Sequence, residues 1–502
     1  MPPTINAVRS LWLSTGGGLP QECLQKLTLS EDPDTAVNSS FKIASAAQTT
    51  IGLAALSAAH FHELQTGTRQ TITVNARHAV LEFRSEAYYT LDNQLPGSIW
   101  DSIAGLYKTK DDSFVRIHTN FPHHRHGILN ILKLPDSAET TREQVQDALL
   151  RWNAVDFEDA AAQAGMCAFA LRSFEQWNQH PQAIALRDTP PVTVMKIGDA
   201  PKRKKVKFKP IYPLEGIRVL DLSRVLAGPI AGRALAAYGA EVLLVTSPNL
   251  PALPNIDVDT SRGKRTTQLD LTQERDRADL QRLTRDADVF LQAYRPGSLN
   301  KKGFGVKELV GMKRKHEHGI ICASLCAWGW DGPWKDRRGF DSLVQTATGF
   351  NLAEAEAYSE FQGKTFNRTH SQPRVFPMQA LDHAAAYLLA YGVNVALCKT
   401  ITDGGSYEVR VSLAAVGQWL KSLGCIPPTT AYGIARPLPM VTYPPVQEVK
   451  DLSSEWVERN DPTHGRKMTA LTHAGILSET PAREREAPMG LNSDSAWWTT
   501  LV

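Results

Sequence analysis

Residues 217–246 read IRVLDLSRVLAGPIAGRALAAYGAEVLLVT, and this stretch decides the fold. It holds two continuous apolar runs of strand length, 217–222 and 240–246, separated by an alanine-rich segment at 230–238. Neither run alternates apolar with polar residues, so both faces of each strand are expected to be covered, as in a parallel sheet between two layers of helices. The stretch therefore predicts a strand, a helix and a second, parallel strand.

The same alternation continues toward the C-terminus. A helix is expected at 276–285, buried strands at 287–293 and 320–325, a long helix at 377–398 and a strand at 406–413. These elements predict an α/β fold: a large Rossmann-like domain with a parallel sheet, accompanied by a smaller α+β domain. The sequence GxGxxG, which marks many dinucleotide sites, is missing.

Composition limits the possible partners. The chain has 502 residues, more than one core usually needs, and its 55 basic and 52 acidic side chains nearly cancel, which argues against nucleic acid or an anionic membrane. Its six cysteines form no CxxC pair, as expected for free thiols in a reducing compartment. No stretch of 18 apolar residues and no signal peptide are visible. We expect a soluble, cytoplasmic protein.

A change of texture near residue 200 marks a domain boundary. Residues 201–207 read PKRKKVK, within a segment that also contains several prolines. We expect a small-domain-like region at 1–200, a basic linker at 201–210 and the Rossmann-like catalytic domain at 211–502. The basic run also fits a nuclear localisation signal, but a solvated linker is the preferred interpretation.

Part of the chain is duplicated. Residues 41–74 and 378–411 both contain a small-residue helix, a turn with glycine and a short strand. Aligned without gaps, Ser45 falls opposite Asp382 and Thr66 opposite Asp403. A carboxylate can form an anhydride and a serine cannot, so we expect the N-terminal copy not to be catalytic.

Several motifs together resemble the class III CoA-transferases, the family of formyl-CoA and carnitine CoA-transferases that also holds the 2-methylacyl-CoA racemases. In the family's order they are LEGIRVLDLSRVLAGP (214–229), SRGKRTTQLDL (261–271), DADVFLQAYRPGSL (286–299), GWDGPWKDRRGFDSLVQTATG (329–349) and ALDHAAAY (380–387). The first 200 residues are similar to the family's second half, which forms its smaller domain. The order of the two parts is therefore rearranged in this chain.

The resemblance implies that Asp382 is a nucleophile. A carboxylate in this position attacks an acyl-CoA thioester, forms an acyl anhydride and then carries coenzyme A as an aspartyl thioester before an acceptor acid takes it. Capping of the helix is the alternative role, since Asp is favoured there. Asp341 matches an acidic position that orients substrate or steers the ionisation of Asp382, with a surface carboxylate as its alternative.

The resemblance also implies a binding site for coenzyme A at the strand ends, formed by Leu226, Ala227, Leu269, Asp270, Leu271, Thr272, Ala293, Tyr294, Arg295, Lys301 and Arg338. For each basic residue a solvated surface charge is the alternative. Acyl-CoA and a carboxylic acid would be the substrates, with no permanently bound cofactor and no metal. Family members form interlocked homodimers, and a homodimer is expected here.

Two rival functions remain open. Racemases of the family carry His at the position of Phe340 as one of two acid/base groups, and a phenyl ring cannot take that role. A non-catalytic CoA-binding protein is the other rival, suggested by the rearranged domains. His383 follows Asp382 but points elsewhere on a helix, so we expect a structural role. The histidines at 118, 123, 124 and 126 fit no standard ligand spacing and predict no metal site.

Overall fold

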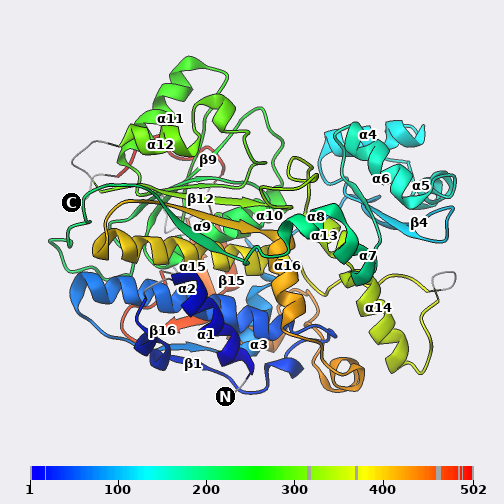
Figure 1. Cartoon of the computed structure of the whole chain (residues 1–502), viewed down its shortest axis with the longest axis horizontal. Helices are drawn as coiled ribbons and strands as arrows, with labels where there is room; N and C mark the ends of the chain where they lie inside the picture. Colours follow the sequence, from blue (N-terminus) through cyan, green and yellow to red (C-terminus); the bar gives the residue numbers. More distant parts are fainter. Residues whose placement is uncertain are drawn as a thin grey trace.

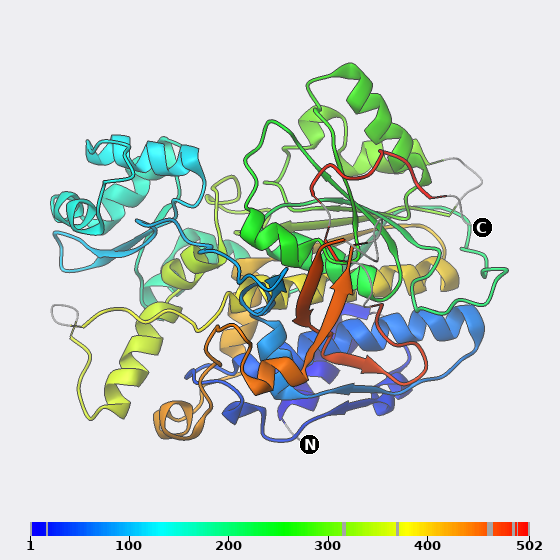
Figure 2. The same cartoon turned by 180° about the vertical axis from the view of Figure 1, so that it is seen from behind.

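The structure is a computed structural model of the chain, and it describes residues 3–16, 19–313, 318–367, 371–458, 465–483, 487–488 and 490–499. Two views from opposite sides show a large α/β body with a smaller lobe at one end (Figures 1 and 2). The expected fold class, a Rossmann-like large domain with a parallel sheet and a smaller α+β domain, is confirmed.

A seven-stranded sheet lies at the centre of the body, with the strand order β10-β9-β8-β11-β12-β13-β7. All neighbours pair in parallel except the edge strand β7, which is antiparallel to β13. The strands are β7 Thr193–Gly198, β8 Arg218–Leu222, β9 Glu241–Thr246, β10 Arg265–Gln268, β11 Val289–Gln292, β12 Ile321–Cys326 and β13 Ser406–Ser412.

Helices cover both faces of this sheet, as the unbroken apolar strands predict. On β8, Val219 faces a core shared with α9 and α15, and its neighbour Leu220 faces a second core under α11 and α12. Figure 1 shows these two layers above and below the sheet. The helices of the body are α9 Ala227–Ala237, α10 Pro254–Thr260, α11 Glu274–Asp286, α12 Val306–Met312, α13 Asp341–Ala347, α14 Phe350–Phe361, α15 Ala380–Thr402 and α16 Leu413–Ser422.

The N-terminal copy of the duplicated unit packs directly against the C-terminal one. Its helix α2 (Ile43–Thr66) lies along α15 (Figure 1), and both helices are buried over nearly their whole length. Helix α15 is long and apolar enough to cross a membrane, but 89% of its most apolar window is buried inside the protein. Its small side chains therefore serve close helix packing here.

Each copy completes the sheet of the other. The N-terminal copy has a three-stranded sheet in the order β1-β2-β16, formed by Leu27–Leu29, Ile72–Val74 and Gly475–Leu477. Its strand β16 comes from the C-terminal tail, whereas β7, which precedes the basic linker, is the edge strand of the large sheet. The predicted boundary at 201–210 thus lies between two strands of one sheet.

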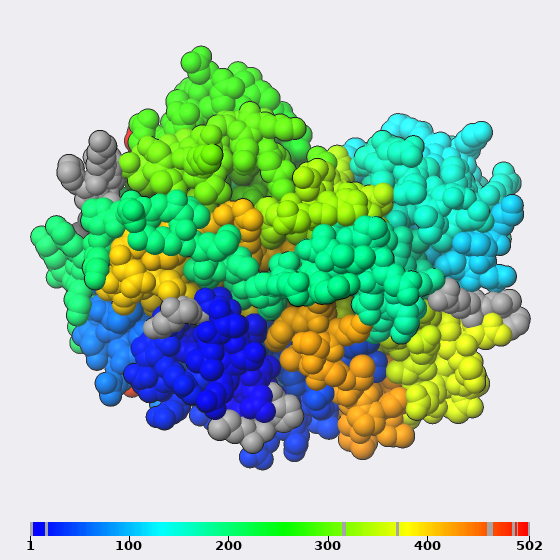
Figure 3. Space-filling view, in the orientation of Figure 1, coloured from blue at the N-terminus to red at the C-terminus, as the bar shows by residue number. Residues whose placement is uncertain are grey.

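A separate lobe, here called the cap (residues 99–170), has its own small core. Figure 3 shows it as a cyan lobe beside the green Rossmann-like part. Its antiparallel sheet β4-β5-β6 is covered by three helices. The elements are β4 Gly105–Lys108, β5 Phe114–Ile117, β6 Ala168–Ala170, α4 Pro122–Leu132, α5 Arg142–Leu149 and α6 Ala154–Gln163.

Shorter elements join these parts. A third small sheet pairs N-terminal β3 with C-terminal β14 and β15. The remaining bounds are α1 Pro3–Gly16, α3 Ala76–Glu82, β3 Thr90–Leu91, α7 Phe174–Gln179, α8 Pro181–Leu186, α17 Gln447–Asp451, β14 Ser453–Val457 and β15 Lys467–Leu471.

A buried cluster of charges ties the N-terminal half to the Rossmann-like domain. Asp259 pairs with Arg233 and, at 3.0 Å, with Arg262, and it accepts a hydrogen bond from Ser85 Oγ at 2.7 Å. All four side chains are essentially buried. Because removing one member leaves an uncompensated charge, this cluster makes the contact between the two halves specific.

Candidate active site

A cleft of about 320 Å³ opens at the carboxyl end of the large sheet. Strand β8 is the first strand of this sheet in the Rossmann-like domain. The next two strands, β9 and β10, lie on one side of β8, and β11 lies on its other side, so the strand order reverses between β8 and β11. Ligands of open α/β sheets bind at such a switch point. The cleft is lined by Phe121, His123, His124, Arg224, Val225, Leu226, Ala227, Gly228, Leu250, Ala293, Tyr294, Arg295, Ser298, Leu325, Cys326, Ala327, Arg338, Gly339, Phe340, Asp382 and Leu413.

The loop after β8 brings backbone to the cleft in a strained conformation. Val225 has a φ of 74°, a left-handed value that is costly for a β-branched residue. It precedes Leu226, the N-cap of α9, so the free N–H groups of that helix start at the cleft. Gly228 is required by close packing, since a Cβ there would lie 2.7 Å from the Cβ of Ala293. This loop fits an anionic ligand.

Asp382 lies in the first turn of α15 and lines the cleft with 9% of its surface exposed. Burial raises the pKa of its carboxyl well above the ordinary value, and the nearby carboxylates of Asp341 and Glu86 raise it further. The side chain is therefore within reach of a ligand and is poorly hydrated. Both properties favour its use as a nucleophile.

Asp341 is fully buried and is not among the residues that line the cleft. Its carboxylate accepts hydrogen bonds from the backbone N–H groups of Leu381 at 2.7 Å and Asp382 at 2.9 Å. Burial raises its pKa to about 6 despite these bonds. Asp341 thus holds the start of α15 and acts on Asp382 through position and charge.

The cap supplies one wall of the cleft. Phe121 is the N-cap of α4, and His123 and His124 lie in that helix's first turn. Both histidines contact Arg338, whose Nη1 is 3.1 Å from His123 Nε2. The cap and Asp382 belong to one chain, so this chain supplies walls of the cleft from both its N-terminal and its C-terminal half.

Phe340 stacks on a histidine of the cap. Its ring lies parallel to that of His118, with 3.8 Å between the centroids. Burial lowers the pKa of His118 to about 3, so the ring is neutral at physiological pH. His118 is therefore a packing partner of Phe340, not a charged acid next to the cleft.

Three arginines line the cleft, namely Arg224, Arg295 and Arg338. Their polar partners are two backbone carbonyls and two histidines: Arg224 donates to Pro251 O, Arg295 to Asp336 O, and Arg338 contacts His123 and His124. Within the described part of the chain, no carboxylate forms an ion pair with any of them. A polyanionic ligand would find its counter-ions here.

Among the predicted site residues, seven line the cleft: Leu226, Ala227, Ala293, Tyr294, Arg295, Arg338 and Asp382. Six do not, namely Leu269, Asp270, Leu271, Thr272, Lys301 and the positioning residue Asp341. The segment 269–272 follows β10, two strands away from β8, and Lys301 lies in the turn Asn300–Lys302. For these residues a contact with the ligand stays a prediction.

Sequence reasoning missed Arg224, Val225 and the whole contribution of the cap. The first two follow directly after a strand, a position that could have marked them. His123 and His124 were judged only as metal ligands. Their place at the start of a helix, just after Pro122, was the available signal.

Two neighbouring positions have structural roles. His383 is fully buried, stacks on Phe83 and bonds Glu86 Oε2 at 3.1 Å, in line with the expected structural role. In the N-terminal copy, Ser45 Oγ lies 3.2 Å from Asp34 Oδ1 and 3.5 Å from Thr4 Oγ1. Ser45, the counterpart of Asp382 in the gap-free alignment, thus has a hydroxyl group where the C-terminal copy has a carboxylate.

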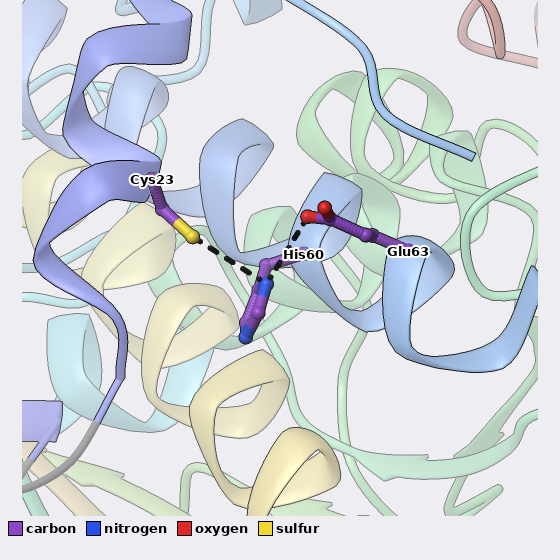
Figure 4. A group of neighbouring side chains, drawn as sticks. All are labelled: Cys23, His60 and Glu63. Carbon is purple, nitrogen blue, oxygen red and sulfur yellow. Dashed lines mark hydrogen bonds and ion pairs between the residues drawn. The ribbon is translucent and has the colours of Figure 1, made fainter. Parts of the chain in front are cut away.

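A second cluster, drawn in Figure 4, combines Cys23, His60 and Glu63. His60 Nδ1 lies 3.5 Å from both Cys23 Sγ and Glu63 Oε2. The carboxylate of Glu63 is already paired with Lys26 at 2.5 Å and with Arg69 at 3.1 Å, and burial raises the pKa of the Cys23 thiol to about 11. Two cations and a protonated thiol disfavour a metal ion at this place.

Comparisons with known proteins relate part of the chain to CoA-transferases. The profile of CoA-transferase family III matches residues 214–429. Acetyl-coenzyme A transferase nodX of Hypoxylon pulicicidum is 30% identical over 337 residues, which cover 64% of this chain and 55% of that protein. An acyl-CoA transferase of Gibberella moniliformis is 29% identical, over 68% of this chain and 57% of that protein.

A crystal structure of a hypothetical protein from Mycobacterium tuberculosis is 32% identical and covers 42% of this chain and 57% of that one, with a TM-score of 0.35. The chain thus spans little more than half the length of the relatives that it matches. Residues 214–429, less than half of the chain, match CoA-transferase family III, and this segment is similar to the proteins of that family.

Proposed function

We propose that the protein transfers coenzyme A from an acyl-CoA to a carboxylic acid, with Asp382 as the nucleophile. The observation that carries the proposal is the position of Asp382 in a cleft that also holds three arginines without carboxylate partners in the described chain. Coenzyme A brings several phosphate charges, and the start of α9 adds N–H groups for an anion. The match of residues 214–429 to CoA-transferase family III supports the same class of reaction.

The proposed reaction has four balanced steps. The Asp382 carboxylate attacks the thioester carbonyl, so an acyl anhydride forms and the CoA thiolate leaves. The thiolate attacks the aspartyl carbonyl, which gives an aspartyl thioester and releases the donor acid. The acceptor carboxylate then attacks this thioester and expels the thiolate, which finally attacks the acceptor's carbonyl and restores Asp382. Held together in one cleft, thiolate and carboxylate react without a further encounter.

The surroundings of Asp382 suit these steps. Burial removes water from the carboxylate, which makes it a better nucleophile and protects the anhydride from hydrolysis. Asp341 fixes the backbone at Leu381 and Asp382, so the attacking oxygen starts from a defined position. Asp341 is therefore proposed as a positioning residue.

We further propose one catalytic centre per chain. The cap of the same chain lines the cleft, and the N-terminal copy has Ser45 in place of Asp382. The homodimer inferred from the family remains a prediction, and so does the cytoplasmic location. Neither is needed to build the proposed centre.

Mass spectrometry of the intact protein tests the proposal. After incubation with a series of short, branched and aromatic acyl-CoA thioesters, the wild-type chain should gain the mass of one CoA thioester. Hydroxylamine should convert it to a hydroxamate on the peptide that contains Asp382. Asp382→Asn should gain nothing. Asp403→Asn, at the opposite end of the same helix, is the matched control and should behave as wild type.

The two rival functions give different results. Deuterium from solvent at the α-carbon of a chiral 2-methylacyl-CoA, without a covalent adduct, would favour a racemase. The Phe340 ring has no acidic or basic group that could exchange an α-proton, and His118 stays neutral. Deuterium exchange is therefore not expected. Tight binding of CoA without an adduct from any thioester would favour a non-catalytic binding protein.

A further inference from the structure

Arg338 is held in place by the cap. Its side chain contacts His123 Nε2 at 3.1 Å and His124 Nε2 more closely, and both histidines belong to the first turn of α4. Its backbone is also fixed, since its carbonyl accepts a hydrogen bond from Trp328 Nε1 at 3.2 Å. The next residue must be glycine, because a Cβ at Gly339 would lie 2.5 Å from the Cβ of Ala327. The guanidinium therefore has a defined position in the cleft.

The two histidines do not neutralise this cation. Burial lowers the pKa of His124 to about 3, and burial and the charge of Arg338 lower that of His123. Neutral imidazoles accept hydrogen bonds from the guanidinium and leave its charge uncompensated. Within the described residues no carboxylate forms an ion pair with Arg338. Its counter-ion must come from a ligand.

A second feature of the cleft calls for that cation. Asp382 lies next to two further buried carboxylates, Asp341 and Glu86, which raise its pKa by repulsion. An acceptor acid has to bring its own carboxylate to the same place. At that step Asp382 is a neutral thioester, but the buried carboxyl groups of Asp341 and Glu86 remain beside it. Without a positive group, an incoming carboxylate would be disfavoured in this poorly hydrated cleft.

We propose that Arg338 binds the reacting carboxylate of the acceptor acid, with His123 and His124 as the positioning residues that aim it. This inference rests on the proposed CoA transfer. It assigns Arg338 to the acceptor in place of a CoA phosphate, and leaves Arg224 and Arg295 for the phosphates. The acceptor's body would meet Phe121, Phe340, Leu226 and Leu413, so the acid is a monocarboxylic acid with a compact apolar body.

The test uses the aspartyl thioester on the full chain. The CoA adduct is first formed with an acyl-CoA, and the excess acyl-CoA is then removed. Propionate, isovalerate or benzoate is added to one sample and hydroxylamine to another, and mass spectrometry follows the loss of the adduct. Hydroxylamine is a neutral nucleophile and needs no cation. Arg338→Met should slow discharge by the acids by roughly 10–100-fold, the usual effect of losing a hydrogen bond to a charged group. Discharge by hydroxylamine should change less than about twofold.

The positioning role has its own pair of variants. Replacing both histidines by Gln keeps an oxygen that accepts from the guanidinium, so the acid discharge should be nearly retained. Replacing both by Leu removes the acceptors and should slow it like Arg338→Met. A structural role in the cap alone would affect acids and hydroxylamine to the same extent in every variant.

Several outcomes would overturn the assignment. Equal slowing of acid and hydroxylamine discharge in Arg338→Met is one. A second is an unchanged rate of acid discharge together with a weaker affinity for CoA, which would indicate that Arg338 binds a CoA phosphate. A wild-type chain without adduct would refute the proposed transfer itself. In that case the role of Arg338 is tested separately, by calorimetric titration of the CoA-loaded chain with benzoate. Equal affinity of wild type and Arg338→Met for benzoate would refute the carboxylate site.

Discussion

The carboxylate of Asp341 accepts a hydrogen bond from the backbone N–H of Asp382 at 2.9 Å. One buried acid thus holds the start of the helix on which the other acid is presented to the cleft. The same contact places two carboxyl groups in a poorly hydrated environment, where they titrate as a pair. The pair links the position of the proposed nucleophile to its ionisation.

Asp341→Asn should shift the pH dependence of adduct formation. Asp382 reacts as a carboxylate, so activity falls as the pH drops below its raised pKa. Asn still accepts the backbone N–H groups but carries no charge, and removal of that charge lowers the pKa of Asp382. The acidic limb of the rate should therefore move to lower pH. Single-turnover rates between pH 4 and pH 8 measure it.

Asp341→Ala is the matched control for this shift. It removes both the charge and the acceptor at the start of α15, and should cost about 1–3 kcal/mol of stability. An acidic limb that stays in place in Asp341→Asn would show that the two carboxyls do not interact.

Asp382→Asn should make the protein inactive and, at pH 8, more stable. The folded-state pKa of Asp382 lies above the unfolded one, so its stabilising contribution is present at low pH and is lost as the pH rises through the folded-state pKa. Asn does not titrate, and the variant should gain about 1–3 kcal/mol over wild type at pH 8. Urea unfolding at pH 4 and pH 8 is the measurement, and the gain should shrink at the lower pH.

Ser45→Asp should not create a second centre. Ser45 is buried beside Asp34 and Thr4. The neighbouring cation, Lys42, already pairs with Asp34 at 3.8 Å, so a second carboxylate there should cost about 2–4 kcal/mol of stability at neutral pH, less at acidic pH. Intact mass should still show at most one CoA adduct per chain. Two adducts, or a stability equal to that of Ser45→Ala, would contradict the expectation.

Arg233→Met should weaken the contact between the two halves of the chain. The guanidinium is buried and pairs with Asp259, and its removal leaves that carboxylate with less compensation. A loss of about 3–5 kcal/mol is expected from urea unfolding. Arg277→Met, on the exposed side of α11, is the control and should stay within about 0.5 kcal/mol of wild type.

The sequence predicted five of the seven strands of the large sheet because their signals are local, and it missed the edge strands β7 and β10. The run at 217–222 became β8 and the segment at 276–285 lies within α11 (Glu274–Asp286), since an unbroken apolar strand or an amphipathic helix is encoded by its own residues. Asp382 was identified through the resemblance to the class III CoA-transferases, and the duplicated helix added the comparison with Ser45. Its presence in the cleft follows from the start of α15 lying at the carboxyl end of the sheet.

Partners distant in sequence could not be read in this way. The residues of β7 and β16 do not predict that each strand joins the sheet of the other half of the chain. Likewise, His123 and Arg338 are 215 residues apart in the sequence, and no local pattern encodes their contact. The site was therefore predicted on the side of the Rossmann-like domain and missed on the side of the cap.

The exchange of β7 and β16 has a consequence for how the chain could be divided. Each strand is anchored by backbone hydrogen bonds in the opposite half, so the two halves hold one another without relying on the peptide bonds at 201–210. Cutting the polypeptide at this exposed basic segment would leave two interwoven fragments rather than two free domains. In the same architecture, the N-terminal copy has Ser45 in place of an acid, yet it still packs against the helix that carries Asp382.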